Sequence, residues 1–368
     1  MSLLSKVSVV LPSLDPDEKL LTVLDGLLAS GFDDIILVND GSKPENLHYF
    51  ETAGQFPQVH VLHHPHNRGK GAALKTAFTW FLENRPDRCG VVTVDGDNQH
   101  HPADTKACAE HMLQTGRITL GVRDFSQPDV PLRSRCGNRI TSLVFKIFVG
   151  MTISDTQTGL RAIPASQLKL LCGVSGDRFE YETNMLLAMK ENRLPFDEVK
   201  IRTVYIEENK SSHFRAVQDS WRIYKLILAH FFRYTLSSVL SFVLDEGMFV
   251  LLSHLLQPHL TGFALTAVPT VCARLVSSMF NFFVNKKLVF RSKSQTAKAL
   301  VRYYMLAVPT ALLQMGLTHG INLLFHIAPS QTLLRALIYA LVMAVLFIVS
   351  FSVQQRWVFA EKQNQEEE

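Results

Sequence analysis

Two carboxylates lie one residue apart, directly after an apolar run of the sequence. The run Val91–Val94 has the β-branched composition of a buried strand, and Asp95-Gly96-Asp97 follows it. The glycine allows a tight turn, so both carboxylates can face one divalent cation, and Gln99 offers a third oxygen ligand. Such ligands suit Mg²⁺ or Mn²⁺, and a site with few protein ligands keeps room for the phosphates of a nucleotide. The alternative for so short a motif is a solvated turn at a strand end.

Three other residues follow apolar runs in a similar way. Pro12 ends the first run, Asp40 follows the second, and Lys70 lies in Arg68-Gly69-Lys70-Gly71 before a predicted helix. A helix N-terminus with a lysine supplies amides, a dipole and a cation for an anion. Asp40 can accept hydrogen bonds from a base or a ribose. The sequence has neither G-x-x-x-x-G-K-[ST] nor G-x-G-x-x-G, so neither an ATPase nor a dehydrogenase is indicated.

These residues need a sheet whose strand ends meet at one edge. The apolar runs predict strands over residues 8–12, 35–38, 59–62 and 91–94, and helices over 17–28 and 71–83. Alternating strands and helices with short links are typical of a mostly parallel sheet, whose ligands bind at the carboxyl ends of the strands. We therefore predict a Rossmann-like α/β domain over residues 1–230, with one site at that edge.

The composition limits the class of protein. The chain has 368 residues and a formal charge of +4, with no long basic tract, so no nucleic-acid partner is expected. Its five cysteines are scattered without paired spacing, which argues for reduced thiols in a cytosol-facing domain rather than for disulfides or a zinc site. The first apolar run is too short for a signal peptide.

From about residue 233 onward, apolar stretches dominate. Four of them approach the length of a membrane span: 235–256, 263–284, 301–325 and 333–354. Lysine and arginine gather before the first stretch, between the second and third, and after the fourth, whereas the loop 253–262 has none. The positive-inside rule then places both termini and the α/β domain in the cytoplasm. We predict a transmembrane domain of four helices over residues 231–360 and an acidic tail over 361–368.

Two further features concern this membrane half. Residues 214–232 predict a basic, amphipathic helix, which suits either an anionic membrane surface or packing on its own domain. Asp245, Glu246 and Arg274 fall inside the first two spans, where ionisable residues are usually paired or functional. A buried ion pair and a phosphate or translocation site built on Arg274 are both open interpretations.

The membrane half also contains an internal repeat. Arg233-Tyr234 recurs as Arg302-Tyr303, and Lys287–Phe290 recurs as Arg356–Phe359, each time 69 residues later. Equal offsets at both ends predict two copies of a two-helix hairpin in the same orientation. The block resembles the GtrA-like family of four-helix membrane proteins, and this resemblance implies a link to the export of sugars carried on polyprenyl phosphate.

The ordered motifs of residues 6–225 resemble those of family 2 glycosyltransferases, in the dolichol-phosphate mannosyltransferase-like, polyprenyl-phosphate glycosyltransferase branch. The segments that carry the resemblance are Val9–Pro12, Val38–Ser42, Asn67–Gly71, Asp95–Pro102, Gly121–Arg123, Ser134–Arg139, Asp155–Arg161 and Phe179–Glu182. The resemblance implies the nucleotide-diphospho-sugar transferase fold called GT-A.

The resemblance also implies roles for single residues. Those implied to bind the nucleotide sugar are Pro12, Asp40, Lys70 and Asp95. Those implied to hold Mg²⁺ or Mn²⁺ on its diphosphate are Asp95, Asp97 and Gln99. Those implied to receive the phosphate of a lipid acceptor are Arg123, Arg133 and Arg135. Asp97 and Arg123 are the catalytic candidates, whereas Asp155, Glu180 and Glu182 are acids without an assigned role.

The expected protein is a membrane-bound, inverting hexosyltransferase. It would move one hexose from a GDP- or UDP-linked sugar to a polyprenyl (undecaprenyl or dolichyl) phosphate at the cytoplasmic face. The acceptor phosphate is already an anion at pH 7, so arginines that position it matter more than a strong base. Two alternatives are a translocator of lipid-linked sugars with a secondary transferase role, and a transferase with a polysaccharide or protein acceptor.

Overall fold

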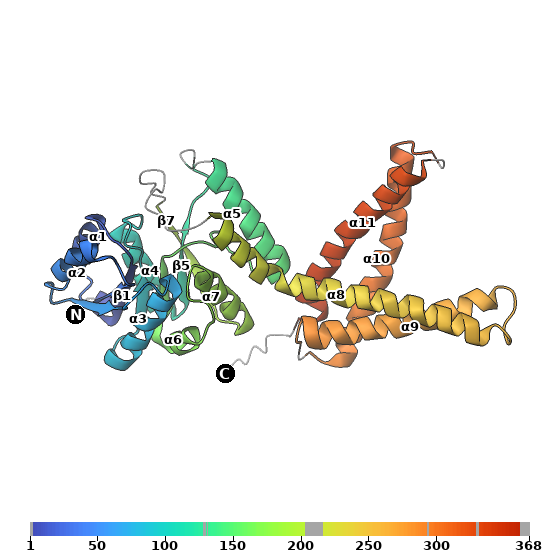
Figure 1. Ribbon diagram of the computed structural model, residues 1–368, viewed down its shortest axis with the longest axis horizontal. Helices are drawn as coiled ribbons and strands as arrows, with labels where there is room; N and C mark the ends of the chain where they lie inside the picture. The colour runs from blue at the N-terminus through green and yellow to red at the C-terminus, as the bar shows by residue number, and fades with distance from the viewer. Residues whose placement is uncertain are drawn as a thin grey trace. The chain divides into compact units, whose positions relative to one another are not determined.

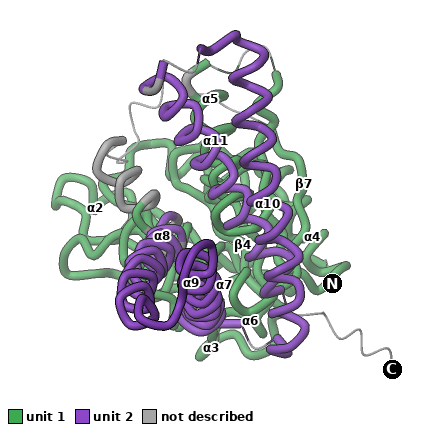
Figure 2. The backbone as a smooth tube through the Cα atoms, turned by 90° about the vertical axis from the view of Figure 1, so that its right-hand side faces the viewer, with its two compact units in different colours: residues 1–226 green, residues 227–368 purple. Residues whose placement is uncertain are grey.

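The computed structural model describes residues 3–127, 130, 132–202, 216–292, 294–328 and 331–360. The chain divides into two compact units, residues 1–226 and 227–368 (Figure 2). The first unit mixes strands and helices, and the second is helical (Figure 1). The acidic tail predicted over 361–368 lies outside the described residues.

Seven strands form one sheet in the first unit, in the order β3-β2-β1-β4-β6-β5-β7. The strands are β1 (Val7–Ser13), β2 (Ile35–Asn39), β3 (Val59–His63), β4 (Gly90–Thr93), β5 (Ile118–Arg123), β6 (Arg161–Pro164) and β7 (Phe196–Ile201). Neighbouring strands run parallel, except that β6 is antiparallel to both β4 and β5. The predicted mostly parallel α/β sheet is therefore confirmed, and one reversed strand is added to it.

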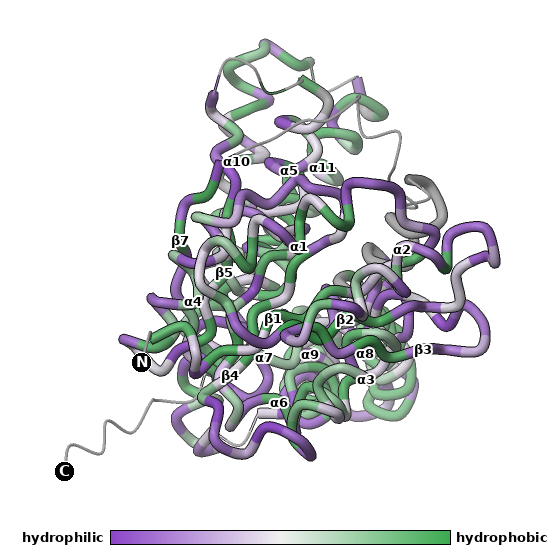
Figure 3. Tube along the Cα trace, turned by 90° about the vertical axis from the view of Figure 1, so that its left-hand side faces the viewer, coloured by the Kyte–Doolittle hydropathy of each residue, from purple (hydrophilic) through white to green (hydrophobic). Residues whose placement is uncertain are grey.

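Helices cover both faces of this sheet. They are α1 (Lys19–Ala29), α2 (Leu47–Ala53), α3 (Lys70–Asn84), α4 (Pro102–Thr115), α6 (Ala165–Cys172) and α7 (Glu180–Glu191), whereas α5 (Leu132–Val144) contacts the π-helical segment Phe145–Val149. Buried side chains of α1, α2 and α4 pack on the face that carries Val7, Val9 and Leu11. α3 lies against β1 and β2 and contacts α6 and α7. Because both faces are covered, the central strands are hydrophobic along their length rather than alternating (Figure 3).

Four long helices form the second unit. They are α8 (Ala216–Leu256), α9 (Ala264–Val284), α10 (Thr296–Leu324) and α11 (Thr332–Val353), and the π-helical segments η5 (Asn285–Val289) and η6 (Gln354–Val358) extend α9 and α11. The predicted amphipathic helix over 214–232 and the first predicted span belong to one continuous helix, α8. Residues 214 and 215 lie outside the described residues.

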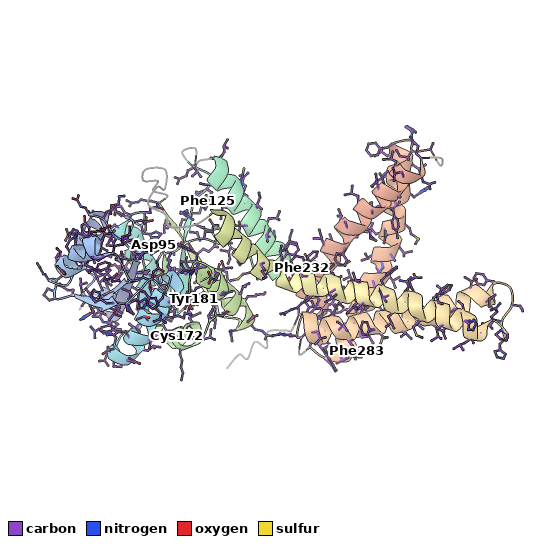
Figure 4. All side chains as sticks on the ribbon, viewed as in Figure 1. Asp95, Phe125, Cys172, Tyr181, Phe232 and Phe283 are labelled. Atoms are coloured by element: carbon purple, nitrogen blue, oxygen red, sulfur yellow. The ribbon has the colours of Figure 1, made fainter. Side chains whose placement is uncertain are left out.

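Within the described residues, three helical segments are long and apolar enough to cross a membrane: Phe231–Leu256, Ala264–Val289 and Leu333–Val358. Exposed apolar side chains such as Phe232 and Phe283 cover them (Figure 4). The remaining predicted span, 301–325, is helical in α10 but does not meet the same hydropathy criterion. α10 carries Gln314, His319 and Asn322, which lower its mean hydropathy. Three of the four predicted spans are thus confirmed as candidate membrane helices, and the span in α10 stays a prediction.

Residues at equivalent positions of the sequence repeat meet each other in this unit. Asn285 and Gln354 begin η5 and η6, and Nδ2 of Asn285 donates to Oε1 of Gln354 over 3.1 Å. Phe290 and Phe359 stack with their ring centroids 5.2 Å apart. The two hairpins therefore pack on each other through the same surface of each copy.

Candidate active site

The candidate site lies where β1, β2 and β4 end. Ser13 of β1 pairs with Asn39 of β2, and Val10 pairs with Thr93 of β4, so the three strands finish at one edge of the sheet. Asp40 follows β2 directly, and Asp95 follows β4 after one residue. The parallel register thus brings residues from distant parts of the sequence to the same edge, as predicted.

Lys70, the first residue of α3, connects two carboxylates at this edge. Its Nζ lies 2.7 Å from Oδ1 of Asp95 and 3.0 Å from Oε1 of Glu182. Burial alone would lower the pKa of Lys70, but the two carboxylates outweigh burial and raise it well above its usual range. Lys70 is therefore a permanent cation beside Asp95. This location agrees with the prediction, whereas the contact with Glu182 was not foreseen.

Two glycines allow the close approach that brings Lys70 to Glu182. A Cβ on Gly69 would overlap the carbonyl oxygen of Asp177, and a Cβ on Gly71 would overlap Cβ of Tyr181. Gly69 also has a φ of 104°, a backbone conformation that favours glycine. The glycines of the Arg-Gly-Lys-Gly motif thus let the start of α3 approach the start of α7. This close approach places the ammonium group of Lys70 next to Glu182.

The carboxylate of Asp40 is hydrogen-bonded to other groups of the protein. Its Oδ1 accepts from the backbone N–H of Arg68 over 3.0 Å, and its Oδ2 accepts from that of Gly69 over 2.7 Å. The ring Nδ1 of His64 lies 2.7 Å from Oδ1. The buried carboxylate therefore fixes the loop that leads into Lys70. The predicted contact of Asp40 with a base or ribose stays a prediction, and a positioning role is now visible beside it.

Asp95 and Asp97 have opposite electrostatic environments. Burial would raise the pKa of Asp95, but Lys70 and His100 hold it well below its usual range. The pKa of Asp97 is raised, first by burial and then by the negative charge of Asp95. Oδ1 of Asp97 accepts from the backbone N–H of Gln99 over 3.1 Å. Lys70 and His100 thus compensate the charge of Asp95, whereas a bound cation would offset the negative charge of Asp97.

The predicted metal ligands fit a divalent cation on these grounds. Asp97 is close enough to Asp95 for the charge of Asp95 to raise the pKa of Asp97, and Gln99 adjoins them. Such an all-oxygen set suits Mg²⁺ or Mn²⁺. Within the described residues, no group of three or more His, Cys, Asp or Glu side chains forms a metal cluster. A cation here would thus depend on two carboxylates and an amide, and would keep positions for other ligands.

Arg123, at the end of β5, forms an ion pair. Its Nε donates to Oδ2 of Asp155 over 2.7 Å, and its Nη2 donates to Oδ1 over 3.2 Å. Asp155 is fully buried and also accepts from the backbone N–H of Gln157. The guanidinium lies 5.1 Å from the ring centroid of Phe125, which is labelled in Figure 4. Arg123 is therefore held in a two-pronged ion pair, a partner that the sequence alone did not supply.

The other two arginines predicted for an acceptor lie on α5. The side chain of Arg133 is outside the described residues. Nη2 of Arg135 donates to the backbone carbonyl of Gln127 over 2.7 Å, and its buried Nε has no hydrogen-bond partner within the described chain. Pro12 lies in β1 opposite Val38 of β2. The structure does not show contacts of Arg135 or Pro12 with Asp95.

Two residues of the site were not given roles by the sequence. Arg161, in β6, is buried and donates from Nη1 to the backbone carbonyl of Glu182 over 2.8 Å. Its Nη2 is buried with no partner among the described residues. Glu182 begins a helix with Glu180, as one interpretation expected, but its side chain turns to Lys70 rather than to solvent. Both lie in segments that carried the family resemblance, which was the available signal.

The ionisable residues of the first two apolar spans form a pair. Nη2 of Arg274 lies 3.0 Å from Oδ2 of Asp245, and Oγ of Ser277 donates to Oδ1 of Asp245 over 2.7 Å. Asp245 is buried, whereas Glu246 is exposed. This geometry favours the ion-pair interpretation of Asp245 and Arg274 over a phosphate site on a free arginine.

Comparisons with known proteins match each half of the chain separately. Residues 8–163 match the family model "Glycosyl transferase family 2", and residues 259–359 match "GtrA/DPMS, transmembrane domain". The second match spans α9 to η6 and includes α10, the helix that is too polar for the hydropathy criterion.

Curated relatives and solved structures align with part of the chain. An uncharacterized protein of Methanocaldococcus jannaschii is 28% identical over 232 residues, which cover 62% of this chain and 93% of the relative. The UDP-N-acetylglucosamine–dolichyl-phosphate N-acetylglucosaminyltransferase of Methanococcus voltae is 26% identical over 219 residues, which cover 55% of this chain and 86% of the relative. Glucosyl-3-phosphoglycerate synthase from Mycobacterium tuberculosis, solved with Mn²⁺ and UDP, is 17% identical with a TM-score of 0.45, over 61% of this chain and 78% of that chain.

Proposed function

We propose that this chain, which joins a family 2 glycosyltransferase domain to a GtrA/DPMS-type transmembrane domain, transfers one hexose from a nucleotide sugar to a polyprenyl phosphate. The donor would be GDP- or UDP-linked, and the anomeric centre would be inverted. The observation that carries the proposal is the pair Asp95 and Asp97 at the strand ends, with Lys70 fixed beside it. The acceptor is supported by the Methanococcus voltae relative, which is named for a dolichyl-phosphate acceptor.

The donor diphosphate is assigned to the edge formed by Lys70 and the Asp-Gly-Asp turn. Lys70 supplies a permanent cation at a helix N-terminus, and Asp40 fixes the loop before it by accepting from the amides of Arg68 and Gly69. When bound by Asp95, Asp97 and Gln99, Mg²⁺ or Mn²⁺ would neutralise charge on the diphosphate leaving group. Glu182 orients Lys70 by accepting from its ammonium group.

The acceptor phosphate is assigned to the arginines that follow β5. A phosphate oxygen would attack C1 of the sugar while the bond from C1 to the nucleotide diphosphate breaks. The electron pair of that bond leaves with the diphosphate, so one displacement inverts the centre without a covalent sugar–enzyme intermediate. Arg123, oriented by Asp155, and Arg133 and Arg135 of α5 are the proposed phosphate-positioning residues.

A cytoplasmic placement of the transferase domain follows from the distribution of positive charge. Lysines and arginines of the second unit cluster at Arg233, around η5 and around Arg356, whereas the loop between α8 and α9 has none. The helices would bring the acceptor to the site from a lipid surface. Membrane anchoring is thus the proposed basic role of the second unit.

Transfer into lipid tests the proposal directly. Membranes that carry the full chain are offered a panel of labelled GDP- and UDP-sugars, and label is then measured in the organic, aqueous and protein fractions. We expect label in the organic fraction, its loss with Asp97→Ala, and no change with Asp87→Ala, an exposed aspartate before β4. Label in the aqueous or protein fraction would instead support a polysaccharide or protein acceptor, and unchanged transfer by Asp97→Ala would refute the assigned site.

A further inference from the structure

The helical unit contains a polar pocket among its four helices. Its volume is about 250 Å³. Its polar lining residues are Tyr234, Ser238, Asn281, Tyr303, Thr310, Gln314, Ser350 and Gln354, and the other lining residues are apolar. None of the lining residues in the described part of the chain is charged. Two larger hollows of the same unit are lined almost entirely by apolar side chains, so the polar groups are concentrated in one place.

A chain of hydrogen bonds fixes one wall of this pocket. Nε2 of Gln354 donates to the hydroxyl oxygen of Tyr234 over 3.1 Å. The hydroxyl of Tyr303 donates to Oδ1 of Asn281 over 3.0 Å, and Nδ2 of Asn281 donates to Oγ of Ser241 over 3.0 Å. Since Tyr234 accepts from Gln354, its own hydroxyl hydrogen is available to a ligand. The wall is therefore preorganised, because these bonds hold the amides and phenols in fixed orientations.

Other polar side chains of the pocket lack hydrogen-bond partners within the described residues. Within the described residues, the side chains of Ser238, Gln314 and Ser350 make no hydrogen bond, and all three are only partly exposed. In a membrane, a polar group without a partner is costly, since lipid chains offer neither donors nor acceptors. An unpaired carboxamide at Gln314 is thus a position where a hydrogen-bonding ligand would be stabilised.

The sequence repeat shows how the second hairpin differs from the first at this pocket. Gln314 and Met343 occupy the positions that Asp245 and Arg274 occupy in the first copy, 69 residues earlier. In the first copy, the ion pair of Asp245 and Arg274 joins α8 to α9. In the second copy, an amide and a thioether replace the two charges, and both line the pocket. The exchange removes an ion pair and leaves uncharged polar groups facing open space.

We propose that this pocket binds an uncharged, hydroxyl-bearing head group the size of one sugar ring. The volume of about 250 Å³ is large enough for a single small polar group. A phosphate would require a cation in such a site, and the lining supplies none. Amide and hydroxyl groups with free donors and acceptors suit sugar hydroxyls. The pocket lies in a different unit from the transferase site, so the inference goes beyond the transfer reaction.

Matched variants of α10 test the pocket. Ala307 lines it, whereas Ala311, four residues later, is exposed and does not. The full chain in nanodiscs is given labelled dodecyl glucoside, mannoside and galactoside. We expect saturable binding of at least one of them, abolished by Ala307→Phe and unchanged by Ala311→Phe. Gln314→Leu should weaken that binding about three- to tenfold, the effect of one lost hydrogen bond.

Competitors identify the head group and its source. Dodecyl phosphate should compete poorly, because the pocket has no cation to bind it. Methyl glycosides distinguish the two sources of the sugar. If the natural ligand is a soluble sugar, methyl glycosides should compete as well as dodecyl glycosides do. If it is a lipid-borne sugar, dodecyl glycosides should compete far better. Equal competition by dodecyl phosphate, or equal binding by the Ala307→Phe and Ala311→Phe variants, would overturn the proposal.

The transfer assay separates this inference from the proposed function. Ala307→Phe should keep transfer to detergent-presented polyprenyl phosphate, since the catalytic residues lie in the first unit. Loss of transfer by Ala307→Phe with intact glycoside binding would assign the pocket to the acceptor and refute the inference. Conversely, Asp97→Ala should bind dodecyl glycosides normally, so a failure of the transferase proposal would leave glycoside binding unaffected.

Discussion

Replacing Lys70 by methionine removes the cation that compensates Asp95. Methionine keeps the length and apolar stem of the side chain but loses the contacts of 2.7 Å with Asp95 and 3.0 Å with Glu182. Asp95 and Glu182 would then face each other and Asp97 without a positive charge between them. We expect a less stable first unit and a loss of transfer, because the diphosphate would lose its protein cation as well.

The size of the stability loss follows from the burial of the pair. Removing one partner of a fully buried ion pair costs about 3–5 kcal/mol. The side chains of Lys70 and Asp95 keep 17% and 29% of their exposure, so solvent screens part of the interaction and we expect about 2–3 kcal/mol. For a unit of this size, each kcal/mol shifts the Tm by about 2–4 °C. Thermal unfolding of the full chain should therefore shift down by about 4–12 °C.

The same helix provides a matched control. Lys75 lies on α3 and pairs with Asp177 over 2.6 Å, but the side chain of Asp177 is 66% exposed. An exposed pair contributes about 0–1 kcal/mol, so Lys75→Met should shift the Tm by no more than a few degrees. If both variants unfold at the same temperature, Lys70 has no special electrostatic role and the reasoning is refuted.

Added Mn²⁺ gives a second readout that depends on the same carboxylates. A cation bound by Asp95 and Asp97 would offset the repulsion that Lys70→Met creates. We expect Mn²⁺ to raise the Tm of Lys70→Met by more than it raises that of the unaltered chain. Equal increments, or none in either protein, would contradict a cation site next to Lys70.

Two further predictions concern the remaining acids. Asp155→Asn should lower the stability of the first unit by about 2–4 kcal/mol in thermal unfolding, because Asp155 is fully buried and Arg123 would lose its carboxylate partner. Burial and Asp95 raise the pKa of Asp97, so Asp97 takes up a proton at a higher pH than an ordinary aspartate does. As the pH is lowered, Mn²⁺ binding measured by calorimetry should therefore begin to weaken at that higher pH. A raised pKa stabilises the protonated form, so the metal-free chain should lose stability as the pH rises through that pKa. Asp97→Asn should remove this loss, and an unchanged pH profile would contradict the assignment.

The sequence determined the location of the site because strand ends are encoded locally. Apolar runs predict where strands finish, and parallel strands must present those ends together. The sequence therefore predicts Asp40, Lys70 and Asp95 at one edge, and the register of β1 with β2 and β4 agrees. The apolar character of α8, α9 and α11 was equally local, since it depends on composition within a single helix.

Pairings between distant segments could not be predicted in this way. Lys70 meets Glu182, and Arg123 meets Asp155, across sequence separations that no periodic pattern reports. The loop-fixing role of Asp40 likewise depends on where the amides of Arg68 and Gly69 come to lie. Such contacts arise only when helices pack on the sheet, so they are properties of the tertiary structure.

In the helical unit, too, some features follow from the sequence alone and others depend on the packing of the helices. The sequence by itself determined the repeat, because identical or similar residues recur 69 positions later. Only the tertiary structure decided that Asn285 bonds to its counterpart Gln354, and that Gln314 and Met343 line a polar pocket where their counterparts in the first hairpin form an ion pair. The physical reason is that a pattern along the chain specifies which face of a helix is polar. What that face meets depends on the other helices that surround it.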